Sequence, residues 1–317
     1  MRLLITGGAG FIGSNFVRYV LSEYPSAEII VLDKLTYAGN VNNLKGVTAD
    51  IEFIKGDICE KRVVDRSVRD CESVINFAAE THVDRSIVDA QAFVQTDIGG
   101  TQVLLEAVKE HQVKQYIQVS TDEVYGSIKE GSFKETDPLN PSSPYAASKA
   151  GADLLVLSYV KTYGLPCAIT RSSNNYGPYQ HPEKLIPHFV TSAIRNRPLT
   201  IYGRGNNVRD WVHVRDNCNA IDLIRRKGKN GEIYNIGAGN ERSNLEITKA
   251  ILQLLGKPST LMRFTVDRPG HDYRYSVNCS KIQALGWRPE IAFDEGLEQT
   301  IHWYKDNEWW WTPLVSQ

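Results

Sequence analysis

The stretch RLLITGGAGFIG, residues 2–13, decides how this chain folds. Its opening run, Arg2–Thr6, has the length and apolar character of a buried strand, and a cluster of glycines follows at once. Ser14–Tyr24 then carries apolar residues at helical spacing. The stretch therefore predicts a strand that turns tightly into a helix.

The same alternation of strand and helix continues through the first half of the chain. Segments with helical spacing, such as Ala90–Glu110, separate further apolar runs. Because these runs do not alternate with polar residues, we expect parallel strands that are covered on both faces. Five more runs complete this predicted doubly wound α/β sheet: Glu28–Leu32, Ile51–Lys55, Ser73–Phe77, Gln115–Ser120 and Pro166–Arg171.

The second half of the chain has a different character. After residue 172 proline and glycine become frequent, and aromatic and basic residues lie between them. One more strand-like run, Glu232–Ile236, is predicted to return to the sheet. We expect a sheet domain of residues 1–172 with a returning segment near 212–240, and a smaller mixed lobe of residues 173–211 and 241–317.

Composition argues against several classes of protein. The 317 residues include 36 Lys and Arg against 37 Asp and Glu, so no basic excess is present to hold nucleic acid or an anionic membrane. The five cysteines are odd in number and lack C-x-x-C spacing, which disfavours disulfides and structural zinc, and we expect no metal. No apolar run approaches the ~20 residues of a membrane span, and the opening run is too short for a signal peptide. We expect a cytoplasmic protein.

The glycines of the first turn have the spacing of a dinucleotide site. Gly8, Gly10 and Gly13 form G-x-G-x-x-G, and Gly7, Gly10 and Gly13 form G-x-x-G-x-x-G. Glycine lets the backbone approach a pyrophosphate closely, and the following helix points its N–H groups at that anion. The position between a strand and a helix is the context that this motif requires.

An acidic residue indicates which dinucleotide is bound. Asp33 ends the next predicted strand, about 20 residues after Gly13, where a carboxylate accepts hydrogen bonds from a ribose and repels a 2′-phosphate. This favours NAD over NADP, and Lys34 beside it weakens the preference. Other residues end predicted strands at the same carboxyl edge, where ligands bind in doubly wound sheets: Asp57, Ile58, Ala78 and Ala79.

Two sets of polar residues are candidates for catalysis. One set follows the fifth predicted strand, and the other lies at the start of the next predicted helix. Strand Gln115–Ser120 runs into Thr121, Asp122 and Glu123. Tyr145 and Lys149 have Y-x-x-x-K spacing, so they share one helical face. An ammonium near a phenol favours the phenolate, and we expect Lys149 to lower the pKa of Tyr145 so that it removes a hydroxyl proton as hydride leaves the same carbon.

These motifs together resemble the extended short-chain dehydrogenase/reductase family over nearly the whole chain, which implies a Rossmann-type sheet with a substrate lobe. Within that family the resemblance is strongest to the 4,6-dehydratases that act on dTDP-glucose. It is carried by four segments besides the glycine turn: residues 33–40, 78–86, 120–126 and 268–272.

The resemblance implies a three-step reaction that ends in dTDP-4-keto-6-deoxyglucose. Hydride passes from sugar C4 to NAD, water is lost across C5 and C6, and the hydride returns to C6. The elimination needs a base and an acid, so two carboxyl groups in different protonation states suit it. By resemblance Glu123 is the C5 base, Asp122 is the acid at the C6 hydroxyl, Thr121 bonds the C4 oxygen, and Tyr145 with Lys149 acts at C4.

Further site residues are implied by the same resemblance. The cofactor, which regenerates in each cycle and is expected to stay tightly bound, is implied to contact Gly7, Gly10, Phe11, Ile12, Gly13, Asp33, Lys34, Thr36, Asp57, Ile58, Ala78, Ala79, Tyr145 and Lys149. The nucleotide sugar is implied to contact His82, Arg85, Asn174, Lys184, Leu185, Tyr202, Arg209, Asn244, Arg268 and His271.

Three positions depart from the family pattern. Asp97 stands where relatives usually carry Asn, Tyr273 where an Arg is usual, and Thr81 where Ser is common. Asp97 puts a carboxylate in place of a neutral amide, and Tyr273 removes a positive charge expected near the nucleotide, so the base that is recognised stays open.

The resemblance also implies assembly. The helix predicted at Tyr145–Tyr163 has an apolar surface too wide for one buried stripe, and resembling enzymes pair through it and through Ala90–Glu110. We expect a homodimer joined by a four-helix bundle. The aromatic run Trp309–Trp311 is interpreted as packing or an assembly surface.

Several readings of function remain open. The chain is a 4,6-dehydratase of dTDP-glucose or of another nucleotide sugar, a UDP-sugar epimerase or decarboxylase, or a catalytically silent NAD(H)-binding protein. The carboxyl pair Asp122 and Glu123 argues against a plain epimerase, which needs no elimination. A silent protein has no need to retain the full set of reactive side chains.

Overall fold

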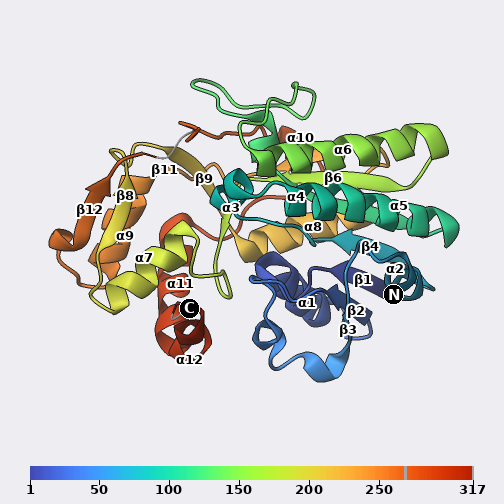
Figure 1. Cartoon of the computed structure of the whole chain (residues 1–317), viewed down its shortest axis with the longest axis horizontal. Coiled ribbons are helices and arrows are strands. Elements are labelled where there is room, and N and C mark those ends of the chain that lie inside the picture. Colours follow the sequence, from blue (N-terminus) through green and yellow to red (C-terminus); the bar gives the residue numbers. More distant parts are fainter. Residues whose placement is uncertain (268–269, 316–317) are drawn as a thin grey trace.

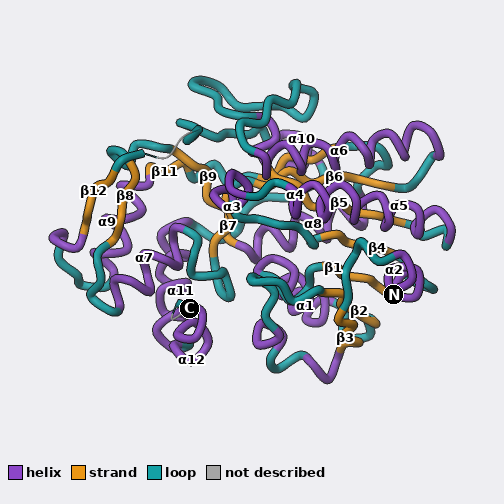
Figure 2. The backbone as a smooth tube through the Cα atoms, in the orientation of Figure 1, coloured by secondary structure: helices purple, strands orange, loops and turns teal. Residues whose placement is uncertain are grey.

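A seven-stranded parallel sheet forms the centre of the molecule (Figures 1 and 2). The computed structural model describes residues 1–267 and 270–315. The strand order is β10-β6-β5-β4-β1-β2-β3, and each of these seven strands lies within one residue of its predicted bounds. The strands are β1 (Arg2–Thr6), β2 (Glu28–Asp33), β3 (Ile51–Lys55), β4 (Ser73–Asn76), β5 (Gln115–Thr121), β6 (Cys167–Ser172) and β10 (Ile233–Ile236).

Helices cover both faces of this sheet, as its apolar strands require. Along β1, Leu3 and Ile5 point into a core under one layer of helices, and Leu4 points into a second core under the other layer. The predicted fold class is therefore confirmed. The first layer contains α1 (Phe11–Glu23) and α8 (Val214–Lys227), and the second contains α2 (Lys61–Val68), α5 (Thr101–Glu110) and α6 (Pro144–Tyr163).

The segment predicted as one helix over Ala90–Glu110 is interrupted. After α3 (Val83–Val88) and the short α4 (Gln91–Phe93), residues Val94–Gly100 form a π-helix that leads directly into α5. At Gly100 a Cβ would collide with the side chain of Ile58, so the chain passes close to its neighbour there. The wider π turn brings Thr96 to the pocket described below and buries Asp97.

A second lobe is built from two small sheets and several helices. A core of aromatic and aliphatic side chains, including Phe189, Trp211 and Ile301, holds it together. The first sheet contains β7 (Asn174–Tyr176), β9 (Val208–His213) and β11 (Glu241–Ser243), and the second contains β8 (Leu199–Tyr202) and β12 (Met262–Thr265). The helices of the second half other than α8 are α7 (Leu185–Ile194), α9 (Asn244–Leu254), α10 (Ser280–Ala284), α11 (Phe293–Asp306) and α12 (Glu308–Trp311).

The terminal tryptophans divide between packing and surface. Trp310 and Trp311 are buried in the second-lobe core, and the Trp310 indole donates to Asn43 Oδ1 at 2.7 Å, which ties the lobe to the sheet domain. Trp309 is exposed, with the Lys45 ammonium 4.3 Å from its ring centre. Among the described residues no helix is long and apolar enough to cross a membrane.

Candidate active site

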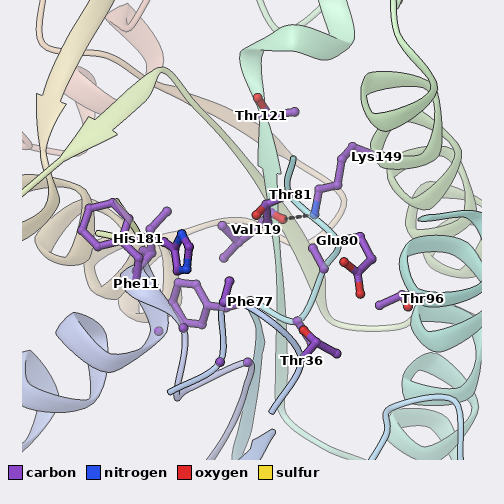
Figure 3. Close-up of a pocket in the computed structure, with 18 of the residues that line it drawn as sticks. Phe11, Thr36, Phe77, Glu80, Thr81, Thr96, Val119, Thr121, Lys149 and His181 are labelled. Atoms are coloured by element: carbon purple, nitrogen blue, oxygen red, sulfur yellow. Dashed lines mark hydrogen bonds between the residues drawn. The ribbon is translucent and has the colours of Figure 1, made fainter. Parts of the chain in front are cut away.

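The main pocket lies where the carboxyl ends of the central strands face the loop after β7. Residues that follow β1, β2, β4 and β5 form one wall, and residues 174–184 close the other side. Figure 3 shows the rings of Phe11, Phe77 and His181 on one side of the pocket, and the polar side chains of Lys149, Glu80 and Thr96 on the other.

The glycine turn at the floor of the pocket has no room for side chains. Gly7 has φ of 66°, and a Cβ there would lie 2.6 Å from the backbone nitrogen of Ala78. A Cβ on Gly13 would collide with the carbonyl oxygen of Gly7. The turn thus exposes backbone in front of the N-terminus of α1, an arrangement that accepts a pyrophosphate.

Asp33 and Lys34 settle into positions that suit a ribose with a free 2′-hydroxyl. The Asp33 carboxylate accepts from the backbone N–H groups of Ala9 (2.9 Å) and Leu35 (2.8 Å), which fix it at the pocket and leave lone pairs on both oxygens. Lys34 pairs with Asp57 at 2.6 Å, so its charge is already partly neutralised. The residues present therefore fit NAD, and all those predicted to contact it line this pocket.

The end of β5 carries the predicted acid and base. Thr121 ends the strand, and its side chain caps the 3-10 turn Asp122–Tyr125 by accepting from the Glu123 backbone N–H. Thr121 Oγ1 accepts from the Glu123 backbone N–H and donates to Asp122 Oδ1, each at 3.3 Å. Asp122 is only 3% exposed, and its Oδ2 has no hydrogen-bond partner among the described residues.

Burial sets the protonation state of Asp122. Desolvation, followed by the neighbouring charge of Glu123, raises the pKa of Asp122 to about 8, while Arg209 works in the opposite direction. Asp122 therefore holds its proton at neutral pH. A protonated carboxyl beside a second carboxylate is the pairing that an elimination needs from an acid and a base.

Tyr145 and Lys149 lie on the face of α6 that lines the pocket, as their spacing predicted. The expected fall in the pKa of Tyr145 is wrong, because burial and the charges of Glu123 and Asp97 raise that pKa well above its ordinary value. Lys149 instead donates from Nζ to the carbonyl oxygen of Val119 at 2.8 Å (Figure 3). The neighbouring Thr121 side chain works in the opposite direction and lowers the pKa of Tyr145.

Asp97 lies in the π-helix and is one of the three positions that depart from the family pattern. Both of its carboxylate oxygens have hydrogen-bond partners. Its Oδ1 accepts from the Glu80 backbone N–H at 3.2 Å, and its Oδ2 accepts from the Ser148 hydroxyl at 2.6 Å. Burial raises the pKa of Asp97 to about 6, against the pull of Lys149. The carboxylate therefore connects Ser148 of α6, the residue before Lys149, with the Glu80 backbone in the wall of the main pocket.

Two of the predicted substrate residues line the main pocket. Lys184 donates from Nζ to the carbonyl oxygen of Thr81 at 2.7 Å, which holds its charge at the pocket. Asn174 begins β7, and its buried Oδ1 has no partner among the described residues. Leu185 opens α7 as the next residue after Lys184 and packs at the edge of the second-lobe core.

His82 and Arg85 gather around Glu183 rather than lining the main pocket. Each lies 3.6 Å from the Glu183 carboxylate, and the Arg85 guanidinium also stacks 3.7 Å from the ring centre of Tyr37. Burial lowers the pKa of His82. Arg85 and Tyr37 also line a second cavity, and Glu183 and His181 line both this cavity and the main pocket.

The remaining substrate residues meet on the second lobe, outside the lining of the main pocket. Arg209 is buried and donates to the carbonyl oxygens of Val208, Asp272 and Tyr273. Tyr202 is 43% exposed, with its ring 6.4 Å from that of His271. The Asn244 backbone N–H bonds Asn207, whose side chain reaches Asp272. Arg268 lies outside the described residues, and the contacts of this group with a nucleotide stay predictions.

Sequence reasoning missed several pocket residues. Glu80 and Thr96 line the cofactor side, and the loop residues Gln180, His181 and Glu183 line the facing wall. Glu80 could have been predicted from the segment of residues 78–86, because it lies between the expected cofactor residues Ala78 and Ala79 and the expected substrate residue His82. No periodicity marks the loop, and Thr96 is placed by the π turn.

A glycine-cradled dinucleotide site facing a Tyr–Lys pair defines a short-chain dehydrogenase/reductase fold and site. The chain belongs to the GDP-mannose 4,6 dehydratase family, whose model matches residues 4–300. A dTDP-glucose 4,6-dehydratase of Streptomyces niveus is 50% identical over 100% of this chain and 96% of its own length.

Solved structures agree with this assignment. DesIV, a dTDP-glucose 4,6-dehydratase of Streptomyces venezuelae crystallised with NAD, superposes with a TM-score of 0.97 at 52% identity, covering 99% of this chain and 100% of DesIV. The UDP-glucose 4-epimerase of Thermus thermophilus, also in complex with NAD, has a TM-score of 0.90 at 33% identity, covering 97% of this chain and 100% of the epimerase.

Proposed function

We propose that this protein is a dTDP-glucose 4,6-dehydratase that uses tightly bound NAD to make dTDP-4-keto-6-deoxyglucose. One observation carries the proposal: the buried carboxyl group of Asp122 and the adjacent Glu123 line the same pocket as Tyr145 and Lys149. An epimerase needs only the tyrosine and lysine, whereas loss of water needs the additional acid and base. The 50% identity to the Streptomyces niveus enzyme supports the same choice.

The chain's own residues divide the chemistry between sugar C4 and C5–C6. Tyr145 acts as a base only as its phenolate, which its raised pKa disfavours and the nearby positive charge of Lys149 favours. It then receives the proton of the C4 hydroxyl while Thr121 bonds the C4 oxygen. NAD, when bound, supplies the hydride acceptor for C4 and the hydride donor for C6. Glu123 then removes the C5 proton, which the new 4-ketone has made acidic.

Asp122 completes the elimination at C6. Its raised pKa of about 8 means that it arrives at neutral pH with a proton to give. It protonates the C6 hydroxyl, which leaves as water, and Glu123 returns a proton to C5 as hydride reaches C6. The low exposure of Asp122 keeps bulk water from taking this proton first.

We propose a division of labour between the two parts of the chain. Residues 1–172 and 212–240 form the NAD-binding domain, which is supported by the seven-stranded sheet and the packing of α8 on it. Residues 173–211 and 241–317 form the nucleotide-sugar lobe. There Tyr202 offers a partly exposed ring to a base, while Arg209, Asn244 and His271 surround one loop beside it.

A comparison of nucleotide sugars tests the proposed function. The purified protein is incubated separately with dTDP-glucose, UDP-glucose and GDP-mannose, and the products are analysed by mass spectrometry. We expect loss of one water from dTDP-glucose at the highest kcat/KM. Faster dehydration of another nucleotide sugar would reassign the substrate, and a change of sugar configuration without loss of mass would identify an epimerase.

We propose that the protein is a homodimer joined by α5, α6 and their partner copies as a four-helix bundle. Apolar side chains stand exposed on the same side of the sheet, with Val88 at 88% and Leu154 at 59%. The contact between α5 and α6 makes them one continuous surface, visible as the teal α5 and the green α6 of Figure 1. Light scattering at micromolar concentration should give twice the chain mass of 35.6 kDa, and a monomer would contradict this assembly.

We propose that the enzyme works in the cytoplasm. All five cysteines are free thiols, and burial raises the pKa of Cys71 to about 11 and that of Cys279 to about 12. Such thiols suit a reducing compartment. Fractionation of cells that express the protein should recover it with cytoplasmic markers, and recovery with an exported fraction would contradict this location.

A further inference from the structure

The second cavity, which shares His181 and Glu183 with the main pocket, has a volume of about 340 Å³. One wall comes from the sheet domain, at Tyr37 in the segment after β2 and at Arg85 in α3. The other wall comes from the second lobe, where residues of α7 and the loop before it face the cavity. Among the described residues expected to contact NAD or the nucleotide sugar, Arg85 alone lines it. The cavity is therefore separate from the proposed cofactor and substrate sites.

The charged side chains that line this cavity are mainly positive. Arg85, Arg195 and Arg197 line it, and within the described part of the chain Glu183 is the one carboxylate among them. Glu183 lies 3.6 Å from Arg85, which is longer than a hydrogen bond, so that guanidinium keeps donors for another anion. Arg195 and Arg197 form no ion pair with a carboxylate that the structure describes. The lining thus has an excess of positive charge.

The two histidines of the cavity do not add to this charge at neutral pH. Burial lowers the pKa of both His181 and His188 below the ordinary value, so both rings are neutral there. A neutral imidazole still offers one N–H donor. The positive charge therefore comes from arginine alone, which stays protonated throughout the physiological range.

Aromatic rings hold two of the arginines in place before any ligand binds. The Arg85 guanidinium lies 3.7 Å from the ring centre of Tyr37. The Arg195 guanidinium lies 4.6 Å from the ring centre of Trp311 and donates to Thr312 Oγ1 at 3.0 Å. A stacked guanidinium keeps N–H groups at its edge for an anion and loses little entropy when the anion binds.

We propose that the second cavity binds a phosphate group, carried by a small phosphorylated molecule or free in solution. A phosphate monoester has about two negative charges near neutral pH, and its oxygens match the planar fork of arginine. Pro182, Leu314 and Val315 add apolar surface beside the arginines, which suits the organic part of such a molecule. The proposal does not depend on the dehydratase assignment, because it concerns binding alone.

Isothermal titration calorimetry of the NAD-loaded enzyme tests this site, with inorganic phosphate and glycerol 3-phosphate as separate probes. Bound NAD keeps the glycine turn of the main pocket from taking up the probe. We expect one ligand per chain with a Kd on the order of 0.1–1 mM. Tighter binding of glycerol 3-phosphate would identify a phosphorylated molecule as the ligand, and equal affinities would identify free phosphate.

Arg197→Gln is the decisive variant. The Arg197 side chain is exposed, and its guanidinium forms no hydrogen bond or ion pair with a described residue, so its replacement should leave the fold intact. We expect it to weaken phosphate binding about 10-fold, and the double variant Arg195→Gln/Arg197→Gln to abolish it. Arg62→Gln is the matched control, because this exposed arginine of α2 lines neither cavity and should bind phosphate like the wild type.

Circular dichroism establishes that each variant folds. Two results would overturn the proposal. The first is a wild-type enzyme that binds neither probe at concentrations up to about 10 mM. The second is an Arg197→Gln enzyme that binds phosphate as tightly as the wild type, which would place the anion elsewhere, for example at Arg209 on the second lobe.

Discussion

The sheet edge and the second lobe hold their functional side chains in different ways. At the sheet edge Asp33, Thr121 and Asp122 follow directly from buried parallel strands, so the strand register sets their positions. On the second lobe, Arg209 is held by carbonyl oxygens of the loop at Asp272 and Tyr273. Tyr202 remains partly exposed.

The difference indicates how the two regions contribute to the reaction. Groups fixed by a sheet are preorganised, and preorganisation lowers the barrier of the chemical step. A side chain that remains partly exposed, such as Tyr202 at the end of β8, becomes ordered when a ligand binds at a cost in entropy, so it contributes mainly to binding. Substitutions at the sheet edge should therefore lower kcat, whereas substitutions on the second lobe should raise KM.

The largest effect is expected at the C5 base. Glu123→Gln removes the base but keeps the shape of the side chain, so elimination should slow by roughly 10³-fold. The first hydride transfer does not need this carboxylate, and NADH absorbance should still rise when dTDP-glucose is added. Rapid mixing followed at 340 nm, with product quantified by mass spectrometry, checks both parts. Near-normal turnover would exclude Glu123 from the base role.

The next largest effect is expected in the glycine turn at the floor of the main pocket. Gly13→Ala places a methyl group against the carbonyl oxygen of Gly7, and we expect a loss of about 1–3 kcal/mol in stability together with loss of bound NAD. Gly99→Ala is the control, because a Cβ there meets no atom within 4 Å. Thermal unfolding and the NAD content of the purified proteins distinguish them, and retained NAD in Gly13→Ala would contradict the cradle.

Asp122 gives the sheet edge a characteristic pH dependence. Its pKa is raised to about 8, so the active protonated form predominates below that pH and is lost as the pH rises through it. Above about pH 8, kcat should fall tenfold per pH unit if elimination limits turnover. A profile measured from pH 6 to 10 on wild-type enzyme checks this, and a rate that stays constant to pH 10 would mean that Asp122 is not the acid.

The smallest effect is expected on the second lobe. Tyr202→Ala removes a ring that we expect to stack on the base, worth about 1–2 kcal/mol, so KM should rise roughly 5- to 30-fold while kcat changes little. Tyr202→Phe keeps the ring and should behave like the wild type. Steady-state kinetics with dTDP-glucose measure the split, and a fall in kcat alone would remove the proposed contrast between the two regions.

The same contrast explains how much could be predicted from the sequence. The bounds of the seven strands in the central sheet were predicted to within one residue, because strands buried on both faces have an unbroken apolar signal. The residues expected to contact the cofactor line one pocket, since parallel strands end at a common edge. Thr96 was missed because a π turn interrupts the expected helix, and His181 because its loop has no periodic pattern.

The electrostatics depended on tertiary packing. The spacing of Tyr145 and Lys149 predicted their shared face correctly, but it carried no information on Glu123 and Asp97, which raise the pKa of Tyr145. Lys149 bonds a strand carbonyl that lies 30 residues away along the chain. Such long-range contacts are set by the fold as a whole and leave no local signal in the sequence.

The most direct test of the dehydratase assignment is incubation of the purified protein with dTDP-glucose in deuterated water, without added NAD. We predict a product that has lost one water and carries one deuterium at C5, because Glu123 exchanges the C5 proton and bound NAD is recycled. Unchanged mass with a new sugar configuration, or no reaction even after NAD is supplied, would contradict the account.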